Sequence, residues 1–211
     1  MQAQAPAKKP HPDTVVIVDD DPLVRGSMES LFRSVGLAAR SHASAIEALE
    51  APLPDAASCL VVDIRMPHLG GFELQQRLGE RGARVPIVFV TGHGDIPMSV
   101  RAMKAGAVDF LPKPFRDQDM LDAVQSALAG DRERRARGDA VRQVREQHAR
   151  LTPREREVMA GVVRGLLNKQ IAYELGLSEI TVKLHRSSLM KKLGLRTVPD
   201  LVRTAQIVAE Y

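Results

Sequence analysis

Short runs of apolar residues alternate with helical patterns from residue 14 to about residue 130. Three of these runs, TVVIVD (14–19), SCLVVD (58–63) and PIVFVT (86–91), are rich in Val and Ile and show no alternation of polar and apolar positions. Strands that are buried on both faces have this pattern. Weaker strands are predicted at 37–41 and 107–111, and helices at 22–35, 72–78, 96–104 and 116–128. Five strand-helix repeats predict an α/β fold with a doubly wound, parallel five-stranded sheet.

The pattern changes after Ala129. Residues 131–149 have no dense apolar face, although a thin stripe recurs at heptad-like spacing: Val141, Val144, His148 and Leu151. We favour a solvated, partly helical linker over a coiled-coil dimer seam, because the stripe is so short. From residue 151 onward the pattern is entirely helical. The predicted organisation is a first domain at 13–130, a linker at 131–149 and a small all-α domain at 150–211.

The last part of the chain carries the signals of a helix-turn-helix. Thr152 is the expected N-cap of its first helix, with Pro153 at the first helical position and a capping-box acid at Glu155. Further on, a short helix ends at Gly176, and Ser178 caps a longer helix that runs to Leu193. The longer helix carries basic residues, Lys183, His185, Arg186, Lys191 and Lys192, around a predicted apolar stripe of Ile180, Leu184, Leu189 and Leu193. A basic helix presented after a tight turn predicts a domain that reads the major groove of DNA.

Composition limits the class of protein. The chain has 211 residues, of which 44% are hydrophobic and 27% charged, values typical of globular proteins. No run of 18 apolar residues is present and the amino-terminal segment lacks a secretory pattern, so we expect a cytoplasmic protein without membrane contact. The single cysteine, Cys59, excludes an internal disulfide and a cysteine-based metal site, and we expect it to be a small core residue.

Charge divides the chain in the same way as the hydrophobic pattern. The net charge of +4 is made of −3 over residues 1–130, +3 over 131–150 and +4 over 151–211. An acidic block followed by a basic one indicates a nucleic-acid-binding tail joined to a domain with another task.

Polar residues end several strands of the predicted sheet. Asp19, Asp20 and Asp21 follow the first strand, and Asp63 and Thr91 end the strands at 58–63 and 86–91. Lys113 follows the last strand. Ligands of open parallel sheets bind beyond the carboxyl ends of the strands, so these side chains should surround one crevice. Crowded carboxylates need a cation, and oxygen-only ligation suits Mg²⁺.

Each of these residues taken alone is more often an ordinary loop residue, since Asp is common in turns. Their coincidence at one edge of the sheet is what favours a functional pocket. With a metal present, one carboxylate can attack a phosphoryl group while an ammonium and a hydroxyl group stabilise the phosphoryl oxygens.

The motifs VIVDDDPLVR, VVDIRMPHLGGFEL and VTGHGDIPMSVRAMKAGAVDFLPKPF resemble, in order and spacing, the receiver domain of bacterial two-component response regulators, most closely the FixJ group. The resemblance implies that Asp63 accepts a phosphoryl group. It implies that Asp19, Asp20 and Asp63 hold Mg²⁺ together with the backbone carbonyl of Arg65. Thr91 and Lys113 would contact the phosphate, whereas the resemblance gives Asp21 no metal role and we interpret it as a helix cap.

Phe110 stands where this family has its switch aromatic. The resemblance implies that phosphate draws Thr91 inward and leaves room for the Phe110 ring to turn. An ordinary core Phe at the end of a strand is an equally good interpretation of the sequence. Members of the family pair through the helix after Thr91, so we expect phosphorylation to produce a homodimer through 96–101, where Met98, Val100 and Arg101 look exposed, and the strand at Val108.

The stretches LTPREREVM, NKQIAYELGLSEITVKLHRSSLMKKLG and TVPDLVRTA resemble the LuxR/NarL-type DNA-binding domain over 150–211. The resemblance makes the helix from Ser178 to Leu193 the recognition helix. Base contacts are implied for Lys183, Leu184 and Ser187, and positions nearer phosphates for Asn168, Lys169, Thr181, His185 and Lys191, with Arg186 also in the interface. Leu184 offers only apolar contacts, either with a thymine methyl group or with the core.

The sequence therefore predicts a transcriptional response regulator without enzymatic activity of its own. A cognate sensor histidine kinase would phosphorylate Asp63, and the dimer would bind promoter DNA, with RNA polymerase as a further partner. Two alternatives remain at this point. Asp19-x-Asp21 also resembles the nucleophile motif of haloacid-dehalogenase phosphatases, although no later acidic pair follows a strand. The other alternative is a DNA-binding protein whose first domain only mediates protein contacts. In that case nothing would explain why its acidic pocket is complete.

Overall fold

The computed structural model of the chain describes residues 12–92 and 95–209. The chain divides into two compact units, residues 1–135 and 136–211, which are described separately below. His93 and Gly94 of the predicted GHGDIP motif, and the last two residues of the predicted 150–211 domain, lie outside the described residues. Within the described part of the chain, no helix is both long and apolar enough to cross a membrane.

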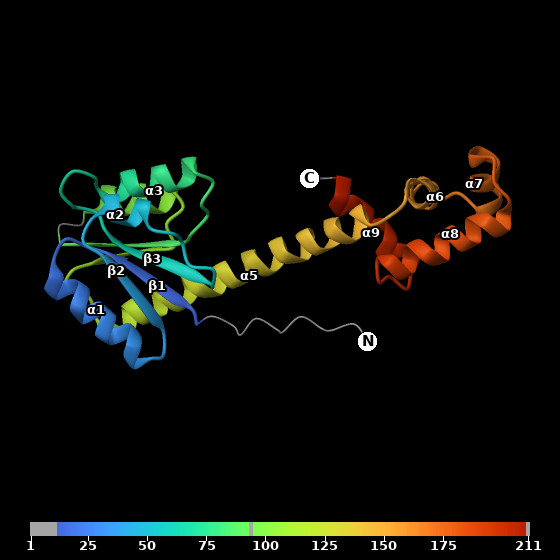
Figure 1. The fold of residues 1–211 in the computed structure, drawn as a ribbon. Coiled ribbons are helices and arrows are strands. Elements are labelled where there is room, and N and C mark those ends of the chain that lie inside the picture. Colours follow the sequence, from blue (N-terminus) through green and yellow to red (C-terminus); the bar gives the residue numbers. More distant parts are fainter. Residues whose placement is uncertain (1–11, 93–94, 210–211) are drawn as a thin grey trace. The chain divides into compact units, whose positions relative to one another are not determined.

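The first unit is built on a parallel sheet with the strand order β2-β1-β3-β4-β5 (Figure 1). Its strands are β1 (Thr14–Val18), β2 (Ala38–His42), β3 (Ser58–Asp63), β4 (Ile87–Thr91) and β5 (Asp109–Pro112). Its helices are α1 (Pro22–Ser34), α2 (Ala45–Glu50), α3 (Gly71–Glu80), α4 (Ile96–Lys104) and the start of α5 (Asp117–Ala149). The predicted doubly wound fold is confirmed, and α2 is an additional short helix that the hydrophobic pattern did not indicate.

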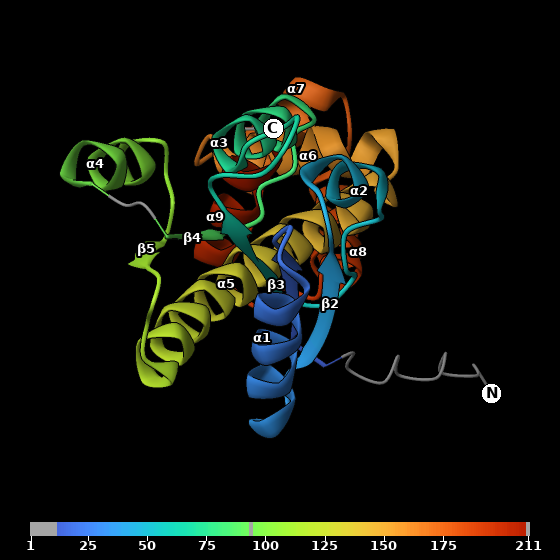
Figure 2. The same cartoon turned by 90° about the vertical axis from the view of Figure 1, so that its left-hand side faces the viewer.

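The two faces of the sheet are covered by different helices. Figure 2 shows α2 and α3 on one side of the sheet and α1 on the other. Val16, Leu60 and Phe89 point to the first side, where they pack with Leu74 of α3 and Ala102 of α4. The strand residues between them, such as Ile17, Cys59 and Val88, point to the other side. There they pack with Phe32 of α1 and Met120 of α5. Cys59 is fully buried, which confirms it as a core residue, and burial raises its pKa to about 12.

Helix α5 runs without a break from Asp117 to Ala149, so residues 131–149 are helical throughout and not only in part. This segment contains no proline and is rich in Ala, Arg, Gln and Glu, which are good helix formers. Within the predicted heptad stripe, Val141 and Val144 are half-buried. Leu151, its last member, belongs to the core of the second unit rather than to a free seam.

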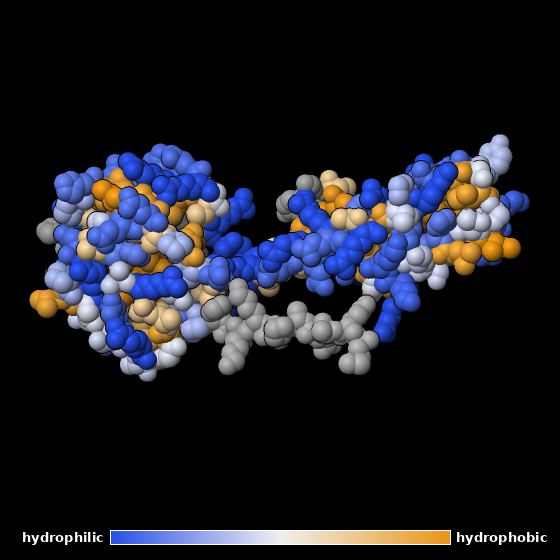
Figure 3. All heavy atoms as spheres, viewed as in Figure 1, coloured by the Kyte–Doolittle hydropathy of each residue, from blue (hydrophilic) through white to orange (hydrophobic). Residues whose placement is uncertain are grey.

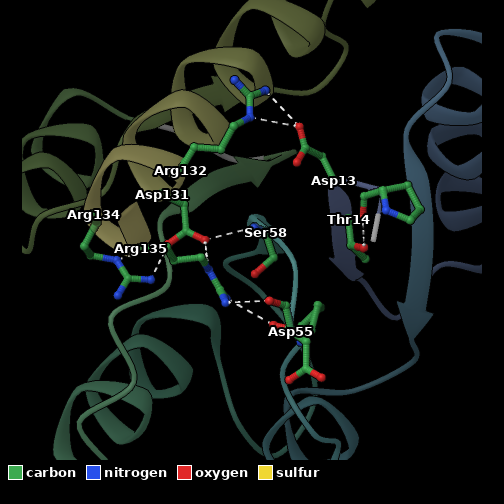
Figure 4. A network of polar contacts seen from close by, with 10 residues as sticks. Asp13, Thr14, Asp55, Ser58, Asp131, Arg132, Arg134 and Arg135 are labelled. Atoms are coloured by element: carbon green, nitrogen blue, oxygen red, sulfur yellow. Dashed lines mark hydrogen bonds and ion pairs between the residues drawn. The ribbon is translucent and has the colours of Figure 1, made fainter. Parts of the chain in front are cut away.

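A polar network ties the middle of α5 to the amino-terminal edge of the sheet (Figure 4). The carboxylate of Asp131 is buried, accepts the backbone N–H of Ser58 at 3.0 Å, and pairs with Arg134 and Arg135. Arg135 also donates to the carbonyl oxygens of Asp55 and Pro54, each at 3.0 Å. Burial acts to raise the pKa of Asp131, but these donors outweigh it and hold the pKa below its ordinary value.

The second unit is a helical bundle of α6 (Pro153–Val163), α7 (Asn168–Leu175), α8 (Glu179–Lys192) and α9 (Val198–Ala209). The capping box of Thr152 and Glu155 is present as predicted. Glu155 also joins α6 to α8, because its carboxylate accepts hydrogen bonds from Ser188 and Lys192, each at 2.7 Å. Burial acts to raise the pKa of Glu155, but these donors lower it to about 2. Helices α6 and α7 pack closely at Gly161, because a Cβ atom on this residue would lie 2.7 Å from the side chain of Ile171.

Candidate functional site

The predicted crevice forms at the carboxyl edge of the sheet. Asp19 follows β1, Asp63 ends β3, Thr91 ends β4 and Lys113 follows β5. Because β1, β3, β4 and β5 are successive neighbours in a parallel sheet, these ends lie side by side. The pairing of Asp63 with Val90 and of Thr91 with Pro112 fixes their register.

One ammonium group joins two of the carboxylates. Lys113 Nζ lies 2.6 Å from Asp19 Oδ2 and 2.8 Å from Asp63 Oδ2. Asp19 is fully buried, whereas Asp63 keeps 8% of its surface exposed. Asp63 is therefore the more accessible of the two carboxylates to a reagent that enters the pocket.

Three carboxylates of the pocket could share one cation. Asp19, Asp20 and Asp63 each offer an oxygen atom, and these atoms lie within 4.8 Å of one another. All the donors are oxygens, and Asp20 is exposed to solvent, so the set suits a hard cation that keeps some of its water, as Mg²⁺ does. The donor chemistry of the predicted magnesium site therefore fits.

The charges of the pocket are strongly coupled. Burial raises the pKa of Asp19 above its ordinary value, although hydrogen bonds from Lys113 and from the backbone of Asp21 act in the opposite direction. Burial acts to lower the pKa of Lys113, but its hydrogen bonds to Asp19 and Asp63 raise it above its ordinary value. The lysine is thus held as a cation between the two carboxylates.

Backbone groups hold the carboxylates in place. The N–H of Arg65 donates to Asp63 Oδ1 at 3.0 Å, and the N–H of Asp21 donates to Asp19 Oδ1 at 2.9 Å. Asp21 itself caps α1 by accepting the N–H groups of Leu23 and Val24, which confirms its interpretation as a helix cap. The metal role predicted for the carbonyl of Arg65 stays a prediction.

Two supporting residues did not emerge from the sequence. The guanidinium of Arg25 donates to the backbone carbonyl of Asp19 at 2.7 Å, which fixes the turn after β1. A Cβ atom on Gly71 would lie 2.6 Å from the carbonyl oxygen of Asp63 and 3.1 Å from the ring of Phe89. Only glycine fits this approach of α3 to the end of β3, and the Gly70-Gly71 pair was the signal for it.

Thr91 and Phe110 lie on the two strands beside the pocket. Thr91 is fully buried at the end of β4, and its carbonyl oxygen accepts the N–H of Lys113 at 2.8 Å. Phe110 pairs in register with Phe89 and packs, half-buried, against the core on the α3 and α4 side. The ring is neither deeply buried nor fully free, and its switch role stays a prediction.

A hollow of about 540 Å³ adjoins the pocket between α1 and the segment after β5. Lys113 is shared between its lining and the acidic pocket. Apolar side chains make up most of the remaining lining, with Leu23, Val24, Met28, Leu31, Pro114 and Phe115 among them. Leu23 is 80% exposed, so an apolar surface lies open next to the carboxylates.

In the second unit, α7, a left-handed turn at Gly176 (φ 65°) and α8 form the predicted helix-turn-helix. Helix α8 has two distinct faces. Val182, Leu189 and Leu193 are buried in the core. The opposite face is exposed over its whole length and carries Ile180, Lys183, Leu184, Ser187 and Lys191.

The predicted apolar stripe of α8 is therefore partly wrong. Ile180 and Leu184 were expected in line with Leu189 and Leu193, but they are exposed. Leu184 and Leu189 are five positions apart, about 140° around a helix, and so cannot share a face. Val182 lies seven positions before Leu189 and occupies the buried position instead.

The other predicted DNA residues lie around this exposed face. Lys169 is exposed in the first turn of α7, whereas Asn168, Thr181, His185 and Arg186 are half-buried. Arg186 donates to Asn168 Oδ1 at 3.1 Å and so joins α8 to the start of α7. A hollow of about 360 Å³ beside α8 has three basic residues in its lining: Lys183, Arg186 and Arg196.

Comparison with known proteins agrees with both halves of this arrangement. Residues 15–125 match the response regulator receiver domain, and residues 149–205 match the luxR family of bacterial regulatory proteins. The chain belongs to the response regulator family. The regulator is 51% identical over 192 residues to nodulation protein W of Bradyrhizobium diazoefficiens. The aligned region covers 91% of this chain and 85% of that protein.

The regulator is also 44% identical to the transcriptional regulatory protein FixJ of Rhizobium meliloti, over 91% of this chain and 94% of that protein. Among solved structures, that of the response regulator StyR matches with a TM-score of 0.85 and 46% identity, over 95% of this chain and 100% of that one. These relatives confirm the predicted FixJ type and make the regulator a transcription regulator rather than an enzyme. The phosphatase alternative with Asp19 as nucleophile is therefore excluded.

Proposed function

We propose that a sensor histidine kinase transfers a phosphoryl group to Asp63, and that this transfer promotes a homodimer which binds double-stranded promoter DNA through α8. The observation that carries the proposal is the contact of Lys113 with Asp63 and Asp19 beside Asp20. A carboxylate, an ammonium group and a set of metal ligands in one partly open pocket are the groups that phosphoryl transfer requires.

The chemistry follows from the accessible carboxylate. An oxygen of Asp63 attacks the phosphorus of a phosphohistidine on the kinase, the P–N bond breaks, and the imidazole keeps the electron pair. Mg²⁺ held by Asp19, Asp20 and Asp63, with the Arg65 carbonyl, would neutralise the charge between carboxylate and phosphoryl oxygens. Lys113, freed from part of its contact with Asp63, then donates to a phosphoryl oxygen, and the Thr91 hydroxyl donates to another.

The kinase needs a surface from which its phosphohistidine reaches Asp63. The apolar hollow between α1 and the segment after β5 meets this need, because Lys113 lines both the hollow and the pocket. Exposed Leu23 at its rim would be covered by an apolar helix face of the kinase.

Dimerisation is supported by the exposed face of α4. Ile96, Val100 and Met103 recur at helical spacing and are 80%, 45% and 49% exposed. Large apolar side chains gathered on one exposed helix face mark a candidate protein–protein contact. Met98 was expected to be exposed as well, but it is half-buried against the core, so Met103 takes its place in the proposed interface. Reorientation of Phe110 beside Thr91 would transmit the change from the pocket to this face.

DNA binding is supported by the exposed face of α8. Lys183, Ser187 and Lys191 lie on it in line, and basic Arg186 and Arg196 line the hollow beside it. We infer that Lys183, Leu184 and Ser187 meet base edges, and that Asn168, Lys169, Thr181, His185, Arg186 and Lys191 lie nearer the phosphates. RNA polymerase would be contacted once the dimer occupies a promoter.

The test is to incubate the full chain with acetyl phosphate and Mg²⁺ and to map the acid-labile phosphoryl group by mass spectrometry. Wild type should be labelled on Asp63, and Asp63→Asn should take up no label. The matched control is Asp21→Asn, which keeps the cap of α1 because Asn is an equally good N-cap. Labelling of Asp63→Asn at the wild-type level would overturn the proposal. Absence of label from the wild-type protein would also overturn it and would favour a first domain that only mediates protein contacts.

A further inference from the structure

Two aliphatic side chains stand exposed on the proposed DNA-binding face. Ile180 is 72% exposed and Leu184 is 65% exposed, and they lie one turn apart on α8. Hydrophobic side chains are visible on the surface along α8 in Figure 3. The core of this unit does not need them, because Val182 and Leu189 fill the buried side of the same helix.

The neighbours of this pair indicate what covers it. Lys183 lies between the two residues in sequence, and Lys191 continues the same face two turns beyond Leu184. Lys183, Arg186 and Arg196 line the adjacent hollow. A surface that combines apolar side chains with this many cations fits a polyanion that also offers apolar groups.

The major groove of DNA is such a surface. Its base edges present hydrogen-bond donors and acceptors and one apolar group, the C5 methyl of thymine. Cytosine, adenine and guanine offer Ile and Leu no comparable contact. An aliphatic side chain placed against their polar edges would leave hydrogen-bond donors and acceptors of the base without partners.

The spacing of the two side chains limits where the methyl groups lie. Four residues of an α-helix rise about 6 Å. Successive bases of one strand are about 3.4 Å apart. A helix in the groove would therefore bring Ile180 and Leu184 to base pairs that are neighbours or one pair apart.

We propose that Ile180 and Leu184 form a thymine-methyl reading pair, which makes each half-site require two closely spaced thymines. This inference rests on the proposed function of α8 as the DNA-binding helix. Lys183 and Ser187 then read polar groups beside the methyls, and Ile180 becomes a specificity-determining residue that the sequence had placed in the core.

The test begins with duplexes selected from a random pool by the full-length wild-type protein. Each thymine of a selected duplex is then replaced singly by deoxyuridine, which lacks the methyl group but keeps every hydrogen-bonding atom. Removal of one buried methyl group should weaken wild-type binding about four-fold. We expect this loss at two thymines per half-site, and no change at the other thymines of the duplex.

Ile180→Ala and Leu184→Ala assign the two positions. At one of the two positions, each variant should bind the duplex with thymine and the duplex with deoxyuridine equally well. At the other position, it should keep the four-fold difference in affinity. Both residues are exposed on a helix, so neither change should lower the melting temperature. The matched control is Ile46→Ala on α2, an exposed isoleucine away from α8, which should keep both differences.

Two results would overturn the inference directly. The first is selected DNA on which no thymine methyl affects wild-type affinity. The second is a methyl effect that both alanine variants retain. Strong, methyl-independent binding contradicts this inference alone, whereas failure to enrich any DNA contradicts the proposed DNA-binding function as well. Alanine variants that lose self-association but keep DNA affinity would instead assign the pair to a protein interface.

Discussion

Lys113 Nζ lies 2.8 Å from Asp63 Oδ2, although 50 positions of sequence separate the two residues. The contact crosses from the end of β3 to the segment after β5, past β4. A phosphoryl group on Asp63 would draw the same ammonium group toward its oxygens. We therefore expect a change of charge at Asp63 to act on the segment after β5, the strand that carries Phe110.

Mg²⁺ should stabilise the regulator through the acidic pocket. A ligand at about 100 times its dissociation constant adds about 2.7 kcal/mol of stability, which is a rise of several degrees in melting temperature. Asp20→Asn should lose most of this rise, because the exposed carboxylate of Asp20 completes the set of ligands. Asp21→Asn is the control and should respond as wild type does. Equal rises in thermal denaturation of Asp20→Asn and wild type would refute the assignment of Asp20.

Removal of the apolar tip of α4 should prevent dimerisation. Ile96→Lys places a charge in the proposed interface, so the variant should remain monomeric after treatment with acetyl phosphate, whereas wild type associates. Sedimentation velocity measures both. Ile46→Lys, an equally drastic change at an exposed isoleucine of α2, should associate as wild type does. Loss of association in both variants would mean that α4 is not the specific face.

Asp131→Ala should destabilise the first unit by about 1 to 3 kcal/mol, because it leaves the buried backbone N–H of Ser58 without its acceptor and removes the partner of Arg134 and Arg135. Urea unfolding measures the loss. Asp139→Ala removes an exposed ion pair with Arg142 on the same helix and should cost less than about 1 kcal/mol.

The contribution of Asp131 should also depend on pH. Its pKa is lowered by folding, so the stabilisation is fully present above the unfolded pKa of about 3.9 and is lost as the pH falls through the folded value. The difference in stability between wild type and Asp131→Ala should be constant from pH 7 to pH 5 and shrink below about pH 4. A difference that grows on acidification would contradict the network.

Lys191→Ala should weaken binding to selected and scrambled DNA alike and reduce the slope of log affinity against log salt by about one, as loss of a phosphate contact does. Lys183→Ala should instead cost about 1 to 3 kcal/mol on the selected site alone. Lys104→Ala, on α4 of the first unit, removes the same charge and should change neither value. Salt titrations of all three variants separate these outcomes, and equal losses for Lys183→Ala on both sequences would make Lys183 a backbone contact.

Much of the acidic pocket could be predicted from the sequence because its residues end strands. Three buried apolar runs fixed where β1, β3 and β4 stop, and the topology of a parallel sheet brought Asp19, Asp63 and Thr91 together. Residues that act through main-chain geometry were not predictable in this way. Gly71 is required because a Cβ atom there would lie 2.6 Å from the carbonyl oxygen of Asp63, which only the folded packing of α3 reveals.

The faces of α8 and the middle of α5 show two different limits of prediction from the sequence. The predicted apolar stripe joined Leu184 to Leu189, whereas the helical period joins Val182 to Leu189, so the buried face of α8 is predictable from its sequence. The burial of Asp131 could not be predicted in this way, because its partner Ser58 lies 73 positions away at the start of β3. A segment of mixed charge therefore looked like a solvated linker although its first turns belong to the first unit.

We propose that the state of Asp63 controls DNA binding by α8. The most direct measurement is the affinity of the full chain for a selected duplex, followed by fluorescence anisotropy before and after acetyl phosphate with Mg²⁺. Wild type and Asp21→Asn should bind at least about five-fold more tightly after treatment, a coupling of about 1 kcal/mol, and Asp63→Asn should not change. Equal gains in Asp63→Asn, or no gain in wild type whose Asp63 is fully phosphorylated, would show that Asp63 does not control DNA binding.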